Sequence, residues 1–297
     1  MKAPNYLKEG DTIGILAPAK AIDKRLISNA ENFWISKGFK VKIGLNAAGQ
    51  HNYFSGTTAA RYKDFETMLS DETVKAIICA RGGYGSVSLI DRLNWSGMFE
   101  HPKWIVGFSD ITFFLQHLNK LGIMGIHGTM PLNYEDNSDE SKEALVKLLK
   151  GEKMNYQWST QHYYNGIIEG RLLGGNLSIL CSLIGTNSMP NYDRAILFIE
   201  DVGEHLYAID RMFYSLSKSG ILDKIKGLIV GDFSNIKDTE TPFGCSLQEI
   251  VMTHLKYRNV AVAFDFPAGH CNHNLPLVIG EKIRLSVNEG YSRLESI

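Results

Sequence analysis

The residues with the clearest chemical potential lie in the stretch W-I-V-G-F-S-D-I-T, at positions 104–112. Its apolar start predicts the end of a buried strand, Gly107 permits a sharp turn, and a helix is expected to follow. Ser109 therefore stands at the apex of a strand–turn–helix, where the first free N–H groups of the helix point. Such a serine can act as a nucleophile, because the adjacent N–H groups stabilise the oxyanion that its attack creates. The stretch alone leaves open a simpler interpretation, in which Ser109 caps the helix, and Ile111 breaks the usual hydrolase pattern G-x-S-x-G.

A glycine-rich segment, R-G-G-Y-G-S at 81–86, follows an apolar strand and precedes a helix. Adjacent glycines let the backbone approach a ligand closely and leave N–H groups available to negative charge. A dinucleotide-binding loop is one interpretation, but the pattern G-x-G-x-x-G is not met and the segment follows the third strand rather than the first. The alternatives are a structural turn and a loop that lends N–H groups to an oxyanion.

Two further residues suit a catalytic triad. Glu200 ends the apolar strand I-L-F-I-E, and a carboxylate there can orient a histidine and stabilise its protonated form. His270 lies in the loop F-P-A-G-H-C-N-H-N at 266–274, and a loop histidine among glycines and prolines is a good candidate for a general base. His273 competes for that role. The spacing H-x-x-H without a clear third ligand does not favour a zinc site.

A second glycine-rich turn, R-L-L-G-G-N-L-S, spans 171–178. Asn176 stands at the expected start of a helix, where it can cap that helix or hydrogen-bond a substrate. Asp201 and Asp210 follow the predicted triad acid, and we expect them to be solvated or to cap the next helix.

In the first half of the chain, predicted strands alternate with predicted helices, and these elements must position the residues named above. Strands are expected at 12–18, 40–45, 74–80, 104–106 and 123–128, and helices at 22–37, 58–69, 87–93 and 111–121. This alternation predicts an α/β domain over 1–133, with a doubly wound parallel sheet covered on both faces. Ligands bind outside the carboxyl ends of such strands, where we expect Arg81, Ser109 and His127.

The composition changes at Tyr134, where the acidic, polar run Y-E-D-N-S-D-E-S begins. We expect a linker over 134–165. The less regular second half, 166–297, predicts a smaller α+β or partly barrel-like domain, with strands near 195–200, 227–233, 260–266 and 283–287.

The composition excludes several classes of protein. The 297 residues are 44% hydrophobic and 21% charged, with a formal net charge of −1, so nothing indicates a nucleic-acid or membrane surface. We expect no signal or membrane-spanning segment. The four cysteines form no C-x-x-C pair, and Cys79 and Cys181 lie in apolar runs, which favours a cytoplasmic setting.

Taken together, the motifs resemble those of the LD-carboxypeptidase family, whose relatives include the microcin C immunity peptidases. The matching segments follow the family order and cover nearly the whole chain: A-R-G-G-Y-G-S (80–86), G-F-S-D-I-T (107–112), H-G-T-M (127–130), G-G-N-L-S (174–178), F-I-E-D-V-G-E (198–204), Y-A-I-D-R-M (207–212) and G-H-C-N-H-N-L-P-L (269–277).

The resemblance implies a serine peptidase with a triad of Ser109, Glu200 and His270. It places the oxyanion hole at the N–H groups of Gly83 and Asp110. It also implies a flavodoxin-like N-terminal domain and a smaller, partly barrel-like C-terminal domain. Three further residues are hypothesised to line the substrate site, the first by pairing with a substrate carboxylate: Arg81, Tyr84 and Asn176.

The implied reaction is hydrolysis of the amide before a C-terminal D-amino acid. The expected substrate is a cytoplasmic muropeptide, the tetrapeptide released in peptidoglycan turnover, which would lose its D-alanine. The resemblance implies no metal or organic cofactor, and it implies a homodimer.

Two other functions compete. An immunity-type peptidase would cleave peptidyl- or aminoacyl-nucleotide conjugates; such relatives tend to be longer, and Trp158 in the linker is the residue that could stack on a nucleotide base. A two-domain binding protein without turnover is the alternative of another class, and it would not react with a serine probe at Ser109.

Overall fold

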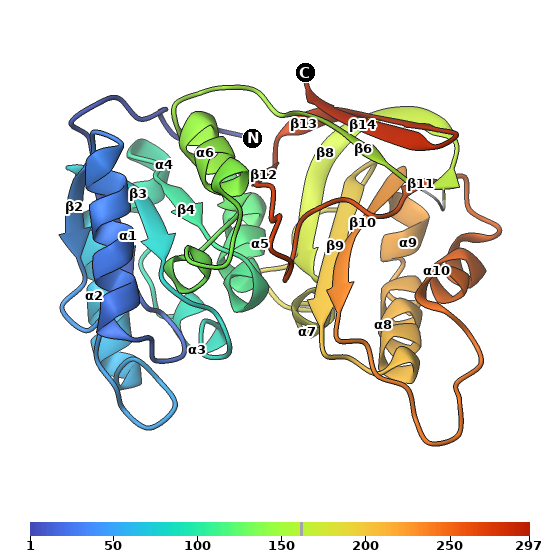
Figure 1. Ribbon diagram of the computed structural model, residues 1–297, viewed down its shortest axis with the longest axis horizontal. Helices are drawn as coiled ribbons and strands as arrows, with labels where there is room; N and C mark the ends of the chain where they lie inside the picture. The colour runs from blue at the N-terminus through green and yellow to red at the C-terminus, as the bar shows by residue number, and fades with distance from the viewer. Residues whose placement is uncertain (161–162) are drawn as a thin grey trace. The chain divides into compact units, whose positions relative to one another are not determined.

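The computed structural model describes residues 1–160 and 163–297. It forms two compact units, the first from residues 1–152 and 272–279, and the second from 153–271 and 280–297 (Figure 1).

The first unit is built on a six-stranded sheet in the order β12-β5-β4-β3-β1-β2. The bounds are β1 Thr12–Leu16, β2 Lys40–Ile43, β3 Val74–Cys79, β4 Trp104–Val106, β5 Gly125–His127 and β12 Leu277–Ile279. Five strands are parallel and only β12 is antiparallel. The order 2-1-3-4-5 is that of the flavodoxin-like doubly wound sheets, so the predicted fold class is confirmed. The inner strands read as apolar runs because both of their faces are buried.

Three helices of the first unit begin where a polar side chain caps them. Asp23, Thr57 and Ser138 each accept a hydrogen bond from a backbone N–H in the first turn of α1, α2 and α6. The bounds are α1 Lys24–Ser36, α2 Thr58–Ser70, α3 Val87–Ile90, α4 Gly97–Glu100, α5 Thr112–Lys120 and α6 Asp139–Leu149, with 3-10 turns at η1 Ser109–Ile111 and η2 Pro131–Asn133.

The units do not follow the expected division at a linker over 134–165. Residues 139–149 form α6, whose apolar face is buried in the first unit, whereas Asn155–Ser159 and Tyr163–Tyr164 form β6 and β7 of the second sheet. Positions 161 and 162 of that predicted linker lie outside the described residues. The chain also returns to the first unit at 272–279, where β12 pairs with β5 and Asn119 donates to the carbonyl of Ile279 at 3.2 Å. The short apolar run L-P-L-V-I was not expected to be a strand.

The second unit is built on an eight-stranded mixed sheet in the order β6-β14-β13-β8-β9-β10-β11-β7. Beyond β6 and β7, the bounds are β8 Gly166–Asn176, β9 Ile196–Val202, β10 Gly227–Ser234, β11 Ala261–Ala263, β13 Lys282–Asn288 and β14 Tyr291–Ser296. Strands β8 to β11 are parallel neighbours, so their carboxyl ends lie at the same edge. The helices are α7 Leu177–Ser182, α8 Leu206–Lys218, α9 Ile221–Lys224 and α10 Leu247–Leu255.

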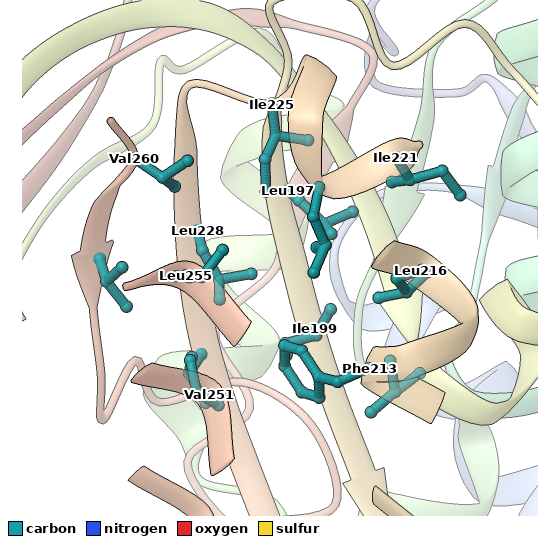
Figure 2. Close-up of a cluster of buried hydrophobic side chains, with 14 of the residues drawn as sticks. Leu197, Ile199, Phe213, Leu216, Ile221, Ile225, Leu228, Val251, Leu255 and Val260 are labelled. Carbon is teal, nitrogen blue, oxygen red and sulfur yellow. The ribbon is translucent and has the colours of Figure 1, made fainter. Parts of the chain in front are cut away.

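An apolar cluster holds the helices of this unit against the parallel strands. Figure 2 shows Ile199 of β9 beside Phe213 of α8 and Leu228 of β10 beside Leu255 of α10, with Leu197 of β9 in the same cluster. These side chains are at most 3% exposed, which anchors β9 and the residues at its carboxyl end.

Among the described residues, no helix has the length and apolar character needed to cross a membrane.

Candidate active site

Ser109 occupies a strained turn between β4 and α5. Its φ is +60°, in the left-handed region that side chains other than glycine rarely adopt and that costs of order 1–3 kcal/mol. Gly107 makes the turn possible, because a Cβ there would lie 2.9 Å from the Ile111 side chain. The N-cap of η1 is Phe108, without a side-chain cap, so the interpretation of Ser109 as a helix cap is wrong. A strained strand-to-helix turn with serine at its apex is the arrangement that exposes the nucleophile of hydrolases.

The glycine-rich segment packs directly against this turn. A Cβ on Gly82 would lie 3.3 Å from the backbone nitrogen of Asp110 and 3.3 Å from the carbonyl oxygen of Phe108. Gly83 has φ +103°, which turns the chain in a way that favours glycine. Within the described residues, the N–H groups of Gly83 and Asp110 donate no hydrogen bond. The two predicted oxyanion donors therefore belong to neighbouring backbone segments beside Ser109.

The Asp110 side chain fastens the two segments together. It is buried, and its Oδ2 accepts a hydrogen bond from the N–H of Ser86 at 3.0 Å. Burial raises the pKa of this carboxyl, and the hydrogen bonds from the loop and the charge of Arg61 offset part of that effect. The position of the Asp110 N–H thus depends on its own side chain.

Arg61 of α2 also holds the loops around this site, and it was not among the residues predicted from the sequence. The side chain is 2% exposed, and its guanidinium donates to the carbonyl oxygens of Pro18, Gly56 (3.3 Å) and Gly85 (3.1 Å). One cation thereby joins the loops that follow β1, β2 and β3. Within α2 nothing but the unusual burial of a charged residue marks this role, and burial is not visible in a single sequence.

Arg81, Tyr84 and His127 differ in what they can offer a ligand. Arg81 Nη1 donates to the carbonyl oxygen of Ala21 at 2.9 Å, so the guanidinium binds a neighbouring loop. Tyr84 is 59% exposed and its ring lies 6.3 Å from that of Phe54. His127 is fully buried with its ring 5.6 Å from that of Phe108, which makes it a core residue rather than a rim residue.

Glu200 and His270 meet in the second unit. Glu200 lies in β9 near its carboxyl end and is fully buried, while His270 follows the segment after β11. His270 Nδ1 and Glu200 Oε2 are 2.7 Å apart, the length of a charge-assisted hydrogen bond. Gly269 permits this approach, because a Cβ there would lie 2.9 Å from the Cβ of Glu200.

For each residue of this pair, burial and the charge of the partner shift the pKa in opposite directions. Burial raises the pKa of Glu200, and the hydrogen bond from His270 offsets that in part. Burial also disfavours the charged form of His270, but the hydrogen bond and charge of Glu200, together with the charges of Asp201 and Asp232, outweigh it and raise the pKa of the imidazole. A histidine with a raised pKa, held through Nδ1 by a carboxylate, is suited to take up a proton at Nε2.

Asn176 and Asp201 form a buried support beside Glu200. Asn176 caps α7 through Oδ1, which accepts from Ile179 N–H at 3.2 Å, and its Nδ2 donates to Asp201 Oδ1 at 3.0 Å. Asp201 also accepts from the N–H of Ser178 at 2.9 Å and is 3% exposed. The expectation that Asp201 is solvated is therefore wrong. It braces the start of α7, the helix before it.

His273, the alternative general base, and Trp158, the possible stacking residue, both make contacts outside the Glu200–His270 pair. His273 belongs to the first unit, where Nδ1 lies 3.0 Å from Ser138 Oγ and Nε2 lies 3.7 Å from a carboxylate oxygen of Glu140, at the start of α6. Trp158 is 8% exposed, donates to the carbonyl oxygen of Phe264 at 2.8 Å, and packs edge-on against Phe266. Its indole is a core group of the second unit.

The N-terminal and the C-terminal parts of the chain both match known proteins of one family. Family models described as the N-terminal and the C-terminal domain of LD-carboxypeptidases match residues 13–128 and 169–285. The chain is 31% identical to a probable murein peptide carboxypeptidase of Bacillus subtilis, over 99% of this chain and 94% of that protein. It is 27% identical to the microcin C7 self-immunity protein MccF of Escherichia coli, over 97% of this chain and 96% of that protein.

A solved structure of the same family has a closely similar fold. The crystal structure of muramoyltetrapeptide carboxypeptidase from Oxalobacter formigenes has a TM-score of 0.89 with 27% identity, covering 96% of this chain and 98% of that one. The strained serine turn, the carboxylate-bound histidine and these matches lead to one conclusion: the chain belongs to the LD-carboxypeptidase family.

Proposed function

We propose that this protein is a serine L,D-carboxypeptidase that removes the C-terminal D-alanine from muropeptide tetrapeptides. The observation that carries the proposal is the hydrogen bond between His270 and the fully buried Glu200. A carboxylate kept out of water beside an imidazole is the acid–base half of a triad. The strained Ser109 supplies the nucleophilic half.

The mechanism follows from these groups. Glu200 holds Nδ1 of His270, and Nε2 accepts the hydroxyl proton of Ser109. The serine Oγ attacks the carbonyl carbon before the D-residue, and the N–H groups of Gly83 and Asp110 stabilise the resulting oxyanion. His270 returns its proton to the leaving amine, and D-alanine departs. Water then attacks the acyl-enzyme, with His270 as base again, and releases the shortened peptide.

The choice of substrate rests on the relatives. Murein and muramoyltetrapeptide carboxypeptidases are among them, and this supports a cell-wall tetrapeptide. MccF is also among them, and its structures hold aminoacyl sulfamoyl nucleosides. Trp158, the residue that could have stacked on a nucleotide base, packs in the core of the second unit, and this supports the tetrapeptide.

The test is release of D-alanine from a cell-wall tetrapeptide by the wild type and by Ser109→Ala. Loss of a triad nucleophile lowers kcat by roughly 10⁴-fold or more. We expect release by the wild type and near silence from the variant. Release by both proteins would mean that Ser109 is not the nucleophile. A wild type that is silent on the tetrapeptide but cleaves a peptidyl-adenylate mimic would assign the protein to the immunity type.

The proposal includes the setting in which such a substrate occurs. Recycled muropeptides are cytoplasmic, so we place the protein there, which fractionation of the producing cells would test. We also propose a homodimer, in line with the family resemblance, and light scattering of the purified protein would test it.

A further inference from the structure

The loops after β1 and β3 diverge at the point where the strand order of the first sheet reverses. Strand β1 lies between β2 and β3. The chain therefore leaves β1 toward β2 on one side of the sheet and leaves β3 toward β4 on the other side. Ligands of doubly wound sheets bind outside the strands' carboxyl ends at this switch point. Lys20 is on the first of these loops and Gly83 on the second, and the N–H of Lys20 donates to the carbonyl oxygen of Gly82 at 3.4 Å.

The Lys20 side chain runs across the face of Gly83. A Cβ on Gly83 would lie 3.1 Å from Lys20 Cβ and 3.5 Å from Lys20 Cδ. The ammonium lies 4.8 Å from the ring centroid of Tyr53, within the range of a cation–π contact. The hydroxyl oxygen of Tyr53 would lie 3.0 Å from the same Cβ. The Lys20 stem and the Tyr53 hydroxyl therefore pack against a proposed oxyanion donor, and the Tyr53 ring holds the ammonium of the same lysine.

This charge has no carboxylate partner in the part of the chain that the structure describes. Arg81, which the resemblance placed at the substrate site, donates from Nη1 to the carbonyl oxygen of Ala21, next to Lys20. Arg81 thus holds the Lys20 loop in place, while the Lys20 ammonium stays available.

We propose that Lys20 is a specificity-determining residue that binds the free terminal carboxylate of the substrate. The inference rests on the proposed function, because a carboxypeptidase cleaves one residue from a charged end and needs a cation near the oxyanion site. The Lys20 ammonium, two bonds beyond the Cδ atom that packs against Gly83, meets that requirement with a charge-assisted hydrogen bond.

The experiment compares a tetrapeptide ending in D-alanine with the same peptide ending in D-alaninamide. Lys20→Met keeps the apolar stem that packs on Gly83 and removes the charge. Lys63→Met is the matched control, since it removes one positive charge from an exposed position on α2. We expect the wild type to prefer the acid by about 10- to 100-fold in kcat/KM, mostly through KM, and Lys20→Met to lose that preference. Lys63→Met should keep it, and Lys20→Arg should recover part of it.

If Lys20 had only a structural role, its replacement would affect the acid and the amide substrates alike. If Lys20→Met lowers kcat/KM equally for acid and amide, or changes neither, the inference is wrong. Binding of both peptides to the Ser109→Ala protein, measured by calorimetry, separates this inference from the proposed function because it needs no turnover. Tighter binding of the acid that disappears when Lys20→Met is added would uphold the carboxylate site even if the wild type releases no D-alanine. Equal affinities for acid and amide would overturn it.

Discussion

Replacing Glu200 by glutamine tests the acid–base half of the site with the smallest change in shape. The 2.7 Å contact with His270 becomes a neutral hydrogen bond, and a charge-assisted bond is worth about 1.5–3 kcal/mol, or roughly 10- to 150-fold in rate. The amide NH₂ can also donate to Nδ1, which leaves the proton on Nε2 and prevents it from accepting one from Ser109. In a serine protease, the corresponding change lowers kcat by about 10⁴-fold. We therefore expect a loss of kcat between about 10² and 10⁴.

The assay is kcat/KM for D-alanine release as a function of pH. The wild-type activity should fall as the pH drops through the raised pKa of His270, which must be neutral to act as a base. In Glu200→Gln the hydrogen bond and charge that raise this pKa are lost, so the acidic limb should move to lower pH. Asp232→Asn is the matched control, because it removes another carboxylate charge near the ring and keeps the hydrogen bond. It should shift the limb in the same direction with a much smaller loss of kcat.

Thermal unfolding separates lost chemistry from lost structure. Burial raises the pKa of Glu200 above its value in the unfolded chain, so its ionised form costs the folded protein free energy at neutral pH. Glutamine removes that charge, and the Tm should not fall. A variant with a wild-type Tm and less than about a threefold loss of kcat would refute Glu200 as the triad acid.

Three further substitutions test neighbouring parts of the site. Gly83→Ala places a methyl group at φ +103°, 3.1 Å from Lys20 Cβ, and should lower kcat by about 10²- to 10³-fold; a loss confined to KM would contradict the role of the Gly83 N–H in stabilising the oxyanion. His273→Ala should retain most activity while His270→Ala loses it, and the reverse result would exchange their roles. Arg61→Met leaves three loop carbonyls without their donor and should lower the free energy of unfolding in urea by about 3 kcal/mol or more; an unchanged midpoint would contradict its role.

The local sequence was informative wherever a physical signal lies within a short segment. The alternation of apolar strands and helices predicted the parallel sheet of the first unit, because strands buried on both faces must be apolar throughout. Asn176 could be predicted as a helix cap, since capping involves only the next three residues. Strand β9 was also visible, with the Glu200 carboxylate at the end of an apolar run.

Long-range contacts decided the rest. Residues 277–279 join the first sheet as β12, yet no local pattern says which sheet a three-residue strand will complete. The expected division at a linker over 134–165 failed to anticipate this return of the chain. Asp201 looked like a surface acid, but its hydrogen bonds to Asn176 and Ser178 bury it.

The sequence by itself therefore determined the fold class and a short set of chemically capable residues, since residue type and spacing carry that information. Only the tertiary structure showed that Ser109 adopts a left-handed φ, that Glu200 lies 2.7 Å from His270, and that the side-chain stem of Lys20 packs against Gly83. Each of these depends on packing between segments that are distant in the chain. Such packing sets backbone strain, burial and charge together, and no single segment contains the information for it.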